Sequence, residues 1–277
     1  MGQFEIDVFN DTMKLSRTKY ANETKAMQSQ VEVITQPISD LLFMPHHRMP
    51  NPNMKVSVIN SGTVSAGKSY ISDGRVAILN FADGCTPGGL VLYGEVTQEE
   101  NICRCSNLYS ALTMQKCHDN YYKPNMCKHG EYTNNIIYAR DVLFFKDDST
   151  YESVTPYYMD VITCPAPSAN LGGRTYDVIS ERVLQIVKSA IYNKVDVLVL
   201  GAWGCGAFGQ SPELVSAAFM NAIKKYSAFD KVIFAVRSCI EGDVKSSKSR
   251  NYEVFKKNCE VKLIELFRFL REKKIHI

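Results

Sequence analysis

The strongest constraint on the fold of this chain is an alternation of apolar runs and helical patterns across its second half. Apolar runs of strand length lie at residues 136–146, 160–164, 195–200 and 231–236. Between them, apolar residues recur at helical spacing over 176–193 and again after Ser211 and Pro212, a typical helix start. Strands and helices that alternate in this way predict an α/β fold, in which helices pack on both faces of a mixed sheet.

The remaining segments fit additions around that sheet. Helical patterns cover residues 1–26 and 250–272, strand patterns cover 31–35 and 56–60, and a proline-rich loop spans 44–53. With 277 residues, 45% of them hydrophobic, the chain is expected to form a single domain. We expect an N-terminal extension over 1–55, a core over 56–240 and a C-terminal helix within 241–277.

Composition and charge exclude several classes of protein. No apolar run approaches the roughly 18 residues that a membrane helix needs, and the first residues lack the basic and apolar regions of a signal peptide. A cytoplasmic protein, or a nuclear one in a eukaryote, is therefore expected. The net charge of +3 does not by itself predict a nucleic-acid binder, although it is compatible with a local basic face. Nine cysteines, an odd number, predict reduced thiols rather than a disulfide framework.

In the first half of the chain, a strand, a glycine loop and an acidic helix start follow one another. The apolar run Val76–Leu79 predicts a buried strand, and Pro87–Gly89 stops its regular continuation. From Thr97 onward, apolar and small residues recur at helical spacing. The helix therefore carries Glu99 and Glu100 in its opening turn, directly after a loop whose glycines let a ligand approach the backbone.

A simpler role for these two carboxylates has to be weighed. Glutamates are common in the first turn of a helix because they complement its positive end. Residues 97–100 also fit the S/T-x-x-E/Q capping pattern, in which Glu100 returns a hydrogen bond to the backbone NH of Thr97. The adjacent glycine loop favours a ligand site over this purely structural role.

A second glycine-rich loop, residues 201–209, lies between a predicted buried strand and the helix that begins at Ser211. In an α/β sheet, backbone NH groups are exposed at this edge, so a diphosphate would fit there. The order of its glycines matches neither the dinucleotide-binding nor the P-loop pattern, and a tight strand–helix connection is the alternative. Cys205 has no histidine or basic neighbour in the loop, which indicates a buried thiol rather than a nucleophile.

Several cysteines and histidines raise the question of a zinc site. They are Cys103, Cys105, Cys117, His118, Cys127 and His129. No C-x-x-C pair occurs among them, and Cys103 and Cys105 project in different directions from a helix. We therefore expect neither a metal nor a cofactor.

The amino-acid sequence around the first loop resembles that of the bacterial-type (microbial) poly(ADP-ribose) glycohydrolases. These are macrodomain-like enzymes whose signature is a Gly-Gly-Gly loop followed by Gln-Glu-Glu. The matching residues are Leu79–Ala82, Pro87–Gly89, Gly94, Gln98–Glu100, Cys103–Arg104 and Ser106–Tyr109. The resemblance covers residues 56 to 240, and Leu90 departs from it by standing at the third glycine.

This resemblance implies a macrodomain-like fold with N-terminal helical additions and a hydrolase that cleaves the ribose glycosidic linkage of ADP-ribose polymers or conjugates. Glu100 would be the general acid and then the base, and Glu99 would orient ribose hydroxyls. In the second loop, the diphosphate would lie on the backbone and Phe208 would pack on the substrate ribose. The implied substrate-binding residues are Asn80, Asp83, Gly88, Gly89, Leu90, Gln98, Gly204, Cys205, Gly206, Ala207 and Phe208.

Leu90 leaves alternatives open. A side chain turned into the core beside Val91 or Leu92 would leave the family's activity intact. A side chain turned into the cleft would give a slow enzyme, an ADP-ribose reader that does not hydrolyse, or a hydrolase for mono-ADP-ribosylated protein or DNA. An active but altered site is the expectation. The expected partners are ADP-ribose or poly(ADP-ribose) and ADP-ribosylated protein, with ADP-ribosylated nucleic acid as a further option. We expect the protein to be a monomer that does not bind membranes.

Overall fold

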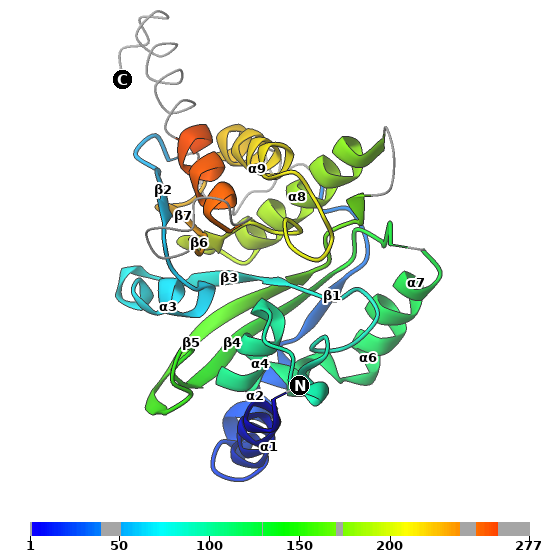
Figure 1. Cartoon of the computed structure of the whole chain (residues 1–277), viewed down its shortest axis with the longest axis vertical. Helices are drawn as coiled ribbons and strands as arrows, with labels where there is room; N and C mark the ends of the chain where they lie inside the picture. Colours follow the sequence, from blue (N-terminus) through cyan, green and yellow to red (C-terminus); the bar gives the residue numbers. More distant parts are fainter. Residues whose placement is uncertain (1, 40–50, 129, 170–173, 239–247, 260–277) are drawn as a thin grey trace, which may run out of the picture.

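Seven strands form one mixed sheet in the computed structural model, which describes residues 2–39, 51–128, 130–169, 174–238 and 248–259 (Figure 1). The strands are β1 (Glu32–Ile34), β2 (Lys55–Ile59), β3 (Val76–Phe81), β4 (Ile136–Lys146), β5 (Ser153–Cys164), β6 (Val197–Leu200) and β7 (Lys231–Ala235). Their order is β1-β4-β5-β3-β6-β7-β2. The pairs β1–β4 and β4–β5 are antiparallel, and all other pairs are parallel.

Strand β3 lies in the middle of the parallel part. Ala77 is in register with Asp160 of β5, and Val76 is in register with Val197 of β6. Residues 76–80 are all buried, which explains why this strand reads as a continuous apolar run rather than an alternating one. Because β2, β3, β5, β6 and β7 run in the same direction, the loops that follow them emerge at one edge of the sheet.

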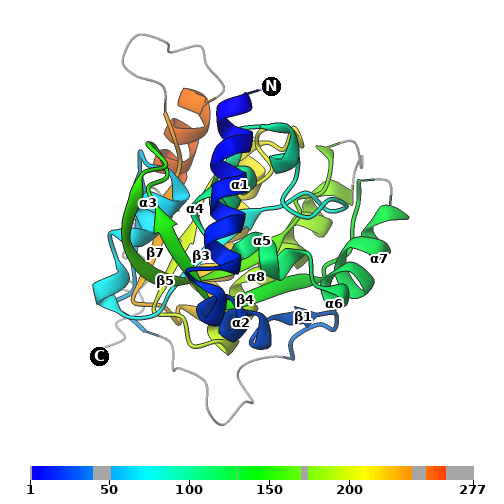
Figure 2. The ribbon, with the colours of Figure 1, turned by 90° about the horizontal axis from the view of Figure 1, so that it is seen from below.

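Helices cover both faces of the sheet (Figures 1 and 2). On one face lie α8 (Thr175–Tyr192), α9 (Pro212–Tyr226) and the helical residues 248–259, whose buried side chains pack with those of the sheet in one hydrophobic cluster. The opposite cluster holds α1 (Gln3–Arg17), α2 (Ala21–Ser29), α3 (Thr63–Lys68), α4 (Gln98–Cys105) and α5 (Leu108–Leu112). The shorter segments are η2 (Ile71–Asp73), η3 (Val91–Tyr93), α6 (Gln115–Cys117), η4 (His118–Tyr122) and α7 (Lys123–Met126).

The N-terminal helix α1 crosses the lower face of the sheet close to α4 (Figure 2). The hydroxyl of Thr12 donates to the carbonyl of Arg104 at 2.6 Å. The buried ammonium of Lys146 reaches across to the carboxylate of Asp11 at 2.8 Å and to the carbonyl of Val8 at 3.1 Å. The N-terminal helices are therefore attached to the sheet by buried polar contacts as well as by apolar packing.

The predicted α/β fold is confirmed, but some local predictions need correction. The helical pattern over 1–26 is two helices separated at residues 18–20, and the helix expected from Thr97 to Leu112 is divided into α4 and α5. It breaks because Ser106 leaves helical geometry to bridge to Phe144 of β4. The short helices at 115–126 were not predicted. Most of the proline-rich loop and the end of the last predicted helix lie outside the described residues.

In the portion of the chain that the structure describes, no helix has the length and apolar character needed to cross a membrane.

Candidate active site

The two glycine loops begin side by side at the carboxyl edge of the sheet. The first follows β3 and the second follows its neighbour β6. A Cβ atom on Gly201, at the start of the second loop, would lie 2.8 Å from the ring of Phe81, the last residue of β3. The structure therefore brings together two segments that are about 120 residues apart in the sequence, as expected for neighbouring parallel strands.

Glu100 faces the first glycine loop. One carboxylate oxygen accepts a hydrogen bond from the backbone NH of Leu90 at 2.9 Å, and the other accepts from the hydroxyl of Thr97. The residue is only 4% exposed. A Cβ atom on Gly89 would lie 2.4 Å from this carboxylate, so only glycine fits opposite it.

The capping role considered for Glu100 is not what the structure shows. Thr97 is the N-cap residue of α4 and has extended backbone geometry, as the pattern predicts. However, its side chain makes no capping hydrogen bond and donates to Glu100 instead. The carboxylate of Glu100 is therefore held toward the loop rather than toward the helix backbone.

Glu99 points to a different part of the site, the end of β3. One carboxylate oxygen accepts from the side-chain amide of Asn80 at 3.2 Å, and the other accepts from the backbone NH of Asp83 at 2.7 Å. Burial raises the pKa of Glu99 well above its ordinary value of 4.5. The hydrogen bonds from Asp83 and Asn80 act in the opposite direction, while the charges of Glu100 and Asp83 add to the increase. The two neighbouring glutamates thus occupy different environments, as their separation around the helix predicts.

Asn80 retains an unused acceptor in this cluster. Its amide nitrogen donates to Glu99 and, at 3.3 Å, to the hydroxyl of Thr163. Its carbonyl oxygen is buried and has no hydrogen-bond partner within the described residues. A buried acceptor without a partner is costly unless a ligand or water supplies a donor, so this oxygen is available to a hydroxyl group.

Gln98 and Asp83 are occupied by contacts within the protein. The side-chain amide of Gln98 accepts from the backbone NH of Phe81 and donates to the carbonyl of Leu79, both at 2.8 Å. The carboxylate of Asp83 accepts from the backbone NH groups of the two residues that begin the next turn, Cys85 and Thr86. Gln98 thereby fastens the start of α4 to β3, and Asp83 shapes the loop.

The first loop uses positive φ at its two glycines and an ordinary conformation at Leu90. Gly88 and Gly89 have φ values of 69° and 58°, which side chains rarely adopt. Leu90 has a φ of −101° and a side chain that is 47% exposed. The alternative in which Leu90 turns into the core is therefore excluded: of the three residues from Leu90 to Leu92, only Val91 is buried. Leucine is tolerated here because this position does not need the left-handed backbone of a glycine.

The second loop is shaped by Gly204 and Gly209, whose φ values are 75° and 69°. Between them, Gly206 and Ala207 are exposed, and a Cβ atom on Gly206 would meet nothing within 4 Å. The loop leads into α9, where the hydroxyl of Ser211 accepts hydrogen bonds from two backbone NH groups of the first turn, as predicted. Burial raises the pKa of Cys205 to about 12, with a contribution from Glu213, so this thiol is protonated and unsuited to nucleophilic attack.

Tyr132 completes the site from a loop that the sequence did not single out. Its ring lies edge-on to the ring of Phe208 at a centroid distance of 6.0 Å, and it also fills the space that a side chain on Gly84 would need. Tyr132 therefore links the two glycine loops. It is preceded by no recognisable motif, and its positive φ of 58° becomes apparent only in the folded chain.

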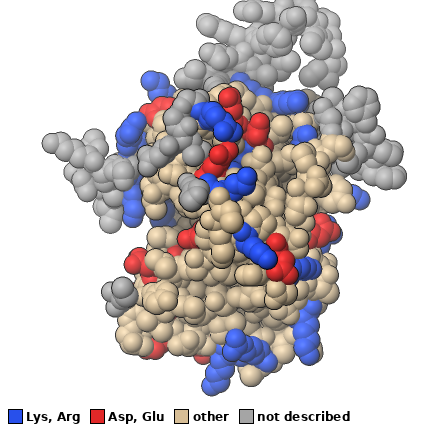
Figure 3. Space-filling view, turned by 90° about the vertical axis from the view of Figure 1, so that its right-hand side faces the viewer, with Lys and Arg blue, Asp and Glu red and all other residues tan. Residues whose placement is uncertain are grey.

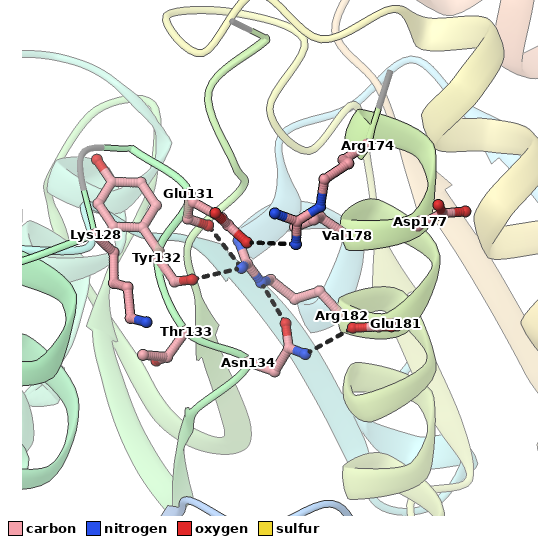
Figure 4. A pocket seen from close by; sticks show the side chains of 10 residues that line it. All are labelled: Lys128, Glu131, Tyr132, Thr133, Asn134, Arg174, Asp177, Val178, Glu181 and Arg182. Atoms are coloured by element: carbon pink, nitrogen blue, oxygen red, sulfur yellow. Dashed lines mark hydrogen bonds and ion pairs between the residues drawn. The ribbon is translucent and has the colours of Figure 1, made fainter. Parts of the chain in front are cut away.

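Arg182 of α8 holds Tyr132 in this position (Figure 4). Its guanidinium donates to the carbonyls of Glu131 at 2.8 Å, Tyr132 at 3.3 Å and Pro165 at 3.0 Å, and to the side chain of Asn134 at 3.2 Å. The residue is 1% exposed, and burial lowers the pKa of its guanidinium. These contacts border a hollow of about 280 Å³ between α8 and the segment that holds Lys128 and Glu131–Asn134. None of the predicted site residues lines it.

The cysteines and histidines considered as zinc ligands do not form a metal site in the described part of the chain. No group of three or more His, Cys, Asp or Glu side chains gathers there, and His129 lies outside the described residues. Basic and acidic side chains are interspersed on the face of the molecule shown in Figure 3 and do not form a basic patch there.

Comparison with known proteins gives a matching family and similar solved structures, but no matching curated protein. Residues 10–147 match the model of the microbial-type PARG catalytic domain, where PARG stands for poly(ADP-ribose) glycohydrolase. The structure resembles the glycohydrolase from Deinococcus radiodurans in complex with ADP-ribose, with 28% identity and a TM-score of 0.76 over 86% of this chain and 97% of that one. No curated protein matches the sequence.

A second group of solved structures shows the same fold. The glycohydrolase from Thermomonospora curvata has a TM-score of 0.76 and 22% identity, covering 93% of this chain and 100% of that chain. The same enzyme bound to the inhibitor ADP-HPD also has a TM-score of 0.76 at 22% identity, covering 92% and 99%.

Proposed function

Through residues 10–147 this chain belongs to the microbial-type poly(ADP-ribose) glycohydrolases, and we propose that it hydrolyses the ribose glycosidic linkage of ADP-ribose polymers with Glu100 as its general acid and base. The observation that carries this assignment is the orientation of Glu100. Its carboxylate is turned away from the helix backbone and held against the glycine loop by Leu90 and Thr97. A carboxylate that only capped the helix would have no need of a glycine at position 89.

The proposed reaction uses one carboxyl group twice. Protonated Glu100 gives its proton to the departing glycosidic oxygen as the bond from that oxygen to the anomeric carbon breaks. The resulting oxocarbenium-like centre is then attacked by water, whose proton returns to Glu100. Because Glu99 and Glu100 are adjacent, their side chains point about 100° apart around the helix, so they do not flank the bond from opposite faces. We therefore give Glu99 a different task.

Glu99 and Asn80 are proposed to bind ribose hydroxyls. The free carbonyl oxygen of Asn80 accepts a hydroxyl proton, and the carboxylate of Glu99 lies beside it. Gln98, whose side-chain amide is engaged within the protein, holds α4 in place, and one carboxylate oxygen of Asp83 holds the loop. Gly88, Gly89 and Leu90 provide the wall against which the ribose lies.

The second loop is proposed to bind the diphosphate. The support is the exposure of Gly206 and Ala207, between two glycines with positive φ, at the start of a capped helix. Gly204, Cys205, Gly206 and Ala207 contribute backbone rather than side chains, and the ring of Phe208 packs on the ribose. Tyr132, edge-on to Phe208, fixes the position of that ring.

Replacing Glu100 by Gln tests the proposed acid. The substitution keeps the size and the hydrogen bond from Leu90 but removes the proton, so the rate of polymer cleavage should fall by roughly 10² to 10⁴. ADP-ribose affinity, measured by calorimetry, should be retained. The matched control is Glu23→Gln, which alters a glutamate in the first turn of α2 and should leave turnover unchanged. Normal turnover in the Glu100 variant would remove this residue from the mechanism.

We propose that ADP-ribosylated protein or nucleic acid can also occupy the site, and that the chain acts as a monomer. A reader that binds without hydrolysis would use the same loops. Incubation with polymer, with singly modified protein and with singly modified DNA separates these possibilities. Release of ADP-ribose from polymer is expected, whereas binding with no product from any of the three would identify a reader. Light scattering at working concentration tests the monomer.

A further inference from the structure

The residues that follow the first glycine loop expose an unusual amount of apolar surface beside Glu100. Leu90, Leu92, Tyr93 and Val96 are 47%, 54%, 58% and 64% exposed, respectively. We call these four residues the apolar rim. Leu90, at its inner end, is the residue whose backbone NH binds the carboxylate of Glu100, so the rim is continuous with the site of proton transfer.

A series of contacts connects the second loop to the rim, and it passes through Glu99 and Glu100. Contacts run from Phe208 to Tyr132, from Tyr132 to Gly84, and from neighbouring Asp83 to Glu99. Beyond Glu99 come Gly89, Glu100 and then Leu90. The rim continues from there to the start of α1, where a Cβ atom on Gly94 would lie 2.7 Å from the carbonyl of Gly2.

This order places the rim where the leaving group departs. If the second loop holds the diphosphate of the ADP-ribose unit being released, that unit extends from Phe208 to Glu100. The group on the far side of the broken bond must then lie beyond Glu100. In an ADP-ribose polymer this leaving group is the adenosine ribose of the preceding unit. It departs through its 2′-oxygen, and the neighbouring carbon, C1′, carries the adenine.

The charges around the rim favour a neutral occupant. Arg104 lies beneath it, but this residue is fully buried and its guanidinium donates to the carbonyls of Glu5 and Glu95. Within residues 90–96, the one acidic or basic residue is Glu95, which would not attract an anionic ligand. A flat uncharged ring suits such a surface, and stacking of a base on an aromatic side chain is favourable.

Resting on the proposed function, we infer that the apolar rim binds the adenine of the leaving ADP-ribose unit and so gives the enzyme a preference for polymer. The altered third glycine becomes part of this surface, since Leu90 adds apolar area next to the acid. Tyr93 supplies the aromatic face, and Leu92 and Val96 extend it.

Two synthetic substrates isolate the adenine. In one, ADP-ribose is joined through its anomeric carbon to the 2′-hydroxyl of adenosine; in the other, it is joined to the same hydroxyl of 1-O-methyl ribose, which lacks the base. We expect kcat/KM to be roughly tenfold higher for the adenosine compound, the scale of one base–aromatic stack. Tyr93→Ala should remove most of that preference and leave cleavage of the base-free compound unchanged. Tyr192→Ala, an exposed tyrosine at the end of α8, is the matched control.

Binding measurements make the test independent of hydrolysis. Both compounds are titrated into the Glu100→Gln variant and into the double variant Glu100→Gln/Tyr93→Ala. Tighter binding of the adenosine compound to the first variant alone supports the inference, even if the native protein proves to be a reader. The inference would be overturned if the native protein cleaved and bound the two compounds equally well. It would also be overturned if Tyr93→Ala lowered kcat/KM by the same factor for both. If Tyr93→Ala slowed cleavage of an ADP-ribosylated serine peptide alone, the rim would bind protein substrates. That result would also overturn the inference that it binds adenine.

Discussion

At the scale of single residues, the environments of Glu99 and Glu100 decide what each carboxylate can do. Both lie against Gly89, but Glu100 takes its hydrogen bonds from Leu90 and Thr97, whereas Glu99 takes its bonds from Asn80 and Asp83. Burial raises the pKa of Glu99. A carboxyl group with a raised pKa makes protein stability depend on pH in a predictable direction.

Glu99→Gln should flatten the pH dependence of stability. Between pH 4.5, the ordinary value, and its raised folded-state pKa, Glu99 is protonated more in the folded than in the unfolded chain. The free energy of unfolding therefore falls as pH rises through that window. Urea unfolding at pH 5 and pH 8 should show a smaller drop for the variant than for the native protein.

The informative quantity is the change in the free energy of unfolding between pH 5 and pH 8. Its absolute value also changes at both pH values, because the substitution alters the hydrogen bonds that Glu99 accepts. If the variant and the native protein show parallel pH profiles, Glu99 is ionised alike in the folded and unfolded states.

At the scale of elements, the second loop separates positions that shape the backbone from a position that faces open space. Gly204 has positive φ, and a Cβ atom there would lie 2.5 Å from the Cβ of Ala166. Gly206 has neither constraint, since a Cβ atom would meet nothing within 4 Å. Substitutions at these two glycines should therefore have different consequences.

Gly206→Val should weaken ADP-ribose binding without lowering the melting temperature. The valine occupies the exposed space over the loop that the diphosphate is proposed to use, and its Cβ atom has no protein atom within 4 Å. Calorimetry with ADP-ribose and with adenosine, which lacks the phosphates, measures the effect; only ADP-ribose should bind less tightly. Gly204→Ala is the contrasting variant and should lower the melting temperature. Undiminished ADP-ribose affinity in the Gly206 variant would exclude this loop from binding.

At the scale of the whole molecule, the N-terminal helices are part of the structure that supports the site. The ring of Phe9 on α1 packs edge-on against Tyr109 at 4.9 Å, and Tyr109 in turn fills the space next to Gly88. Thr12 and Asp11 make polar contacts with Arg104 and Lys146. We therefore propose that the chain folds as one domain, in which residues 1–55 are not a separate unit.

Phe9→Ala should lower the free energy of unfolding by about 3–5 kcal/mol, the usual cost of truncating a buried phenylalanine. Phe9 is 2% exposed. Unfolding should remain a single transition when followed by fluorescence and by circular dichroism. Phe4→Ala in the same helix is the control and should change stability little, because Phe4 is 61% exposed. A separate early transition in the Phe9 variant would show that the N-terminal helices form a unit of their own.

Much of this architecture could be predicted because its signals are local. Strand β3 is a short apolar run, β4 spans the residues expected for it, and α9 begins at a serine cap followed by proline. The breaks were harder to predict. The division between α4 and α5 depends on a bridge from Ser106 to β4, a partner that lies 38 positions away in the sequence at Phe144.

By itself, the sequence determined the α/β alternation, the two glycine loops and the placement of Glu99 and Glu100 in the first turn of a helix, because spacing and residue type carry that information. Only the tertiary structure decided that Glu100 faces the loop instead of capping its helix, that Leu90 is exposed, and that Tyr132 joins the site. The orientation of Glu100 depends on the loop opposite α4, and the position of Tyr132 depends on the guanidinium of Arg182. Local propensity does not contain such contacts, since packing of the whole sheet creates them.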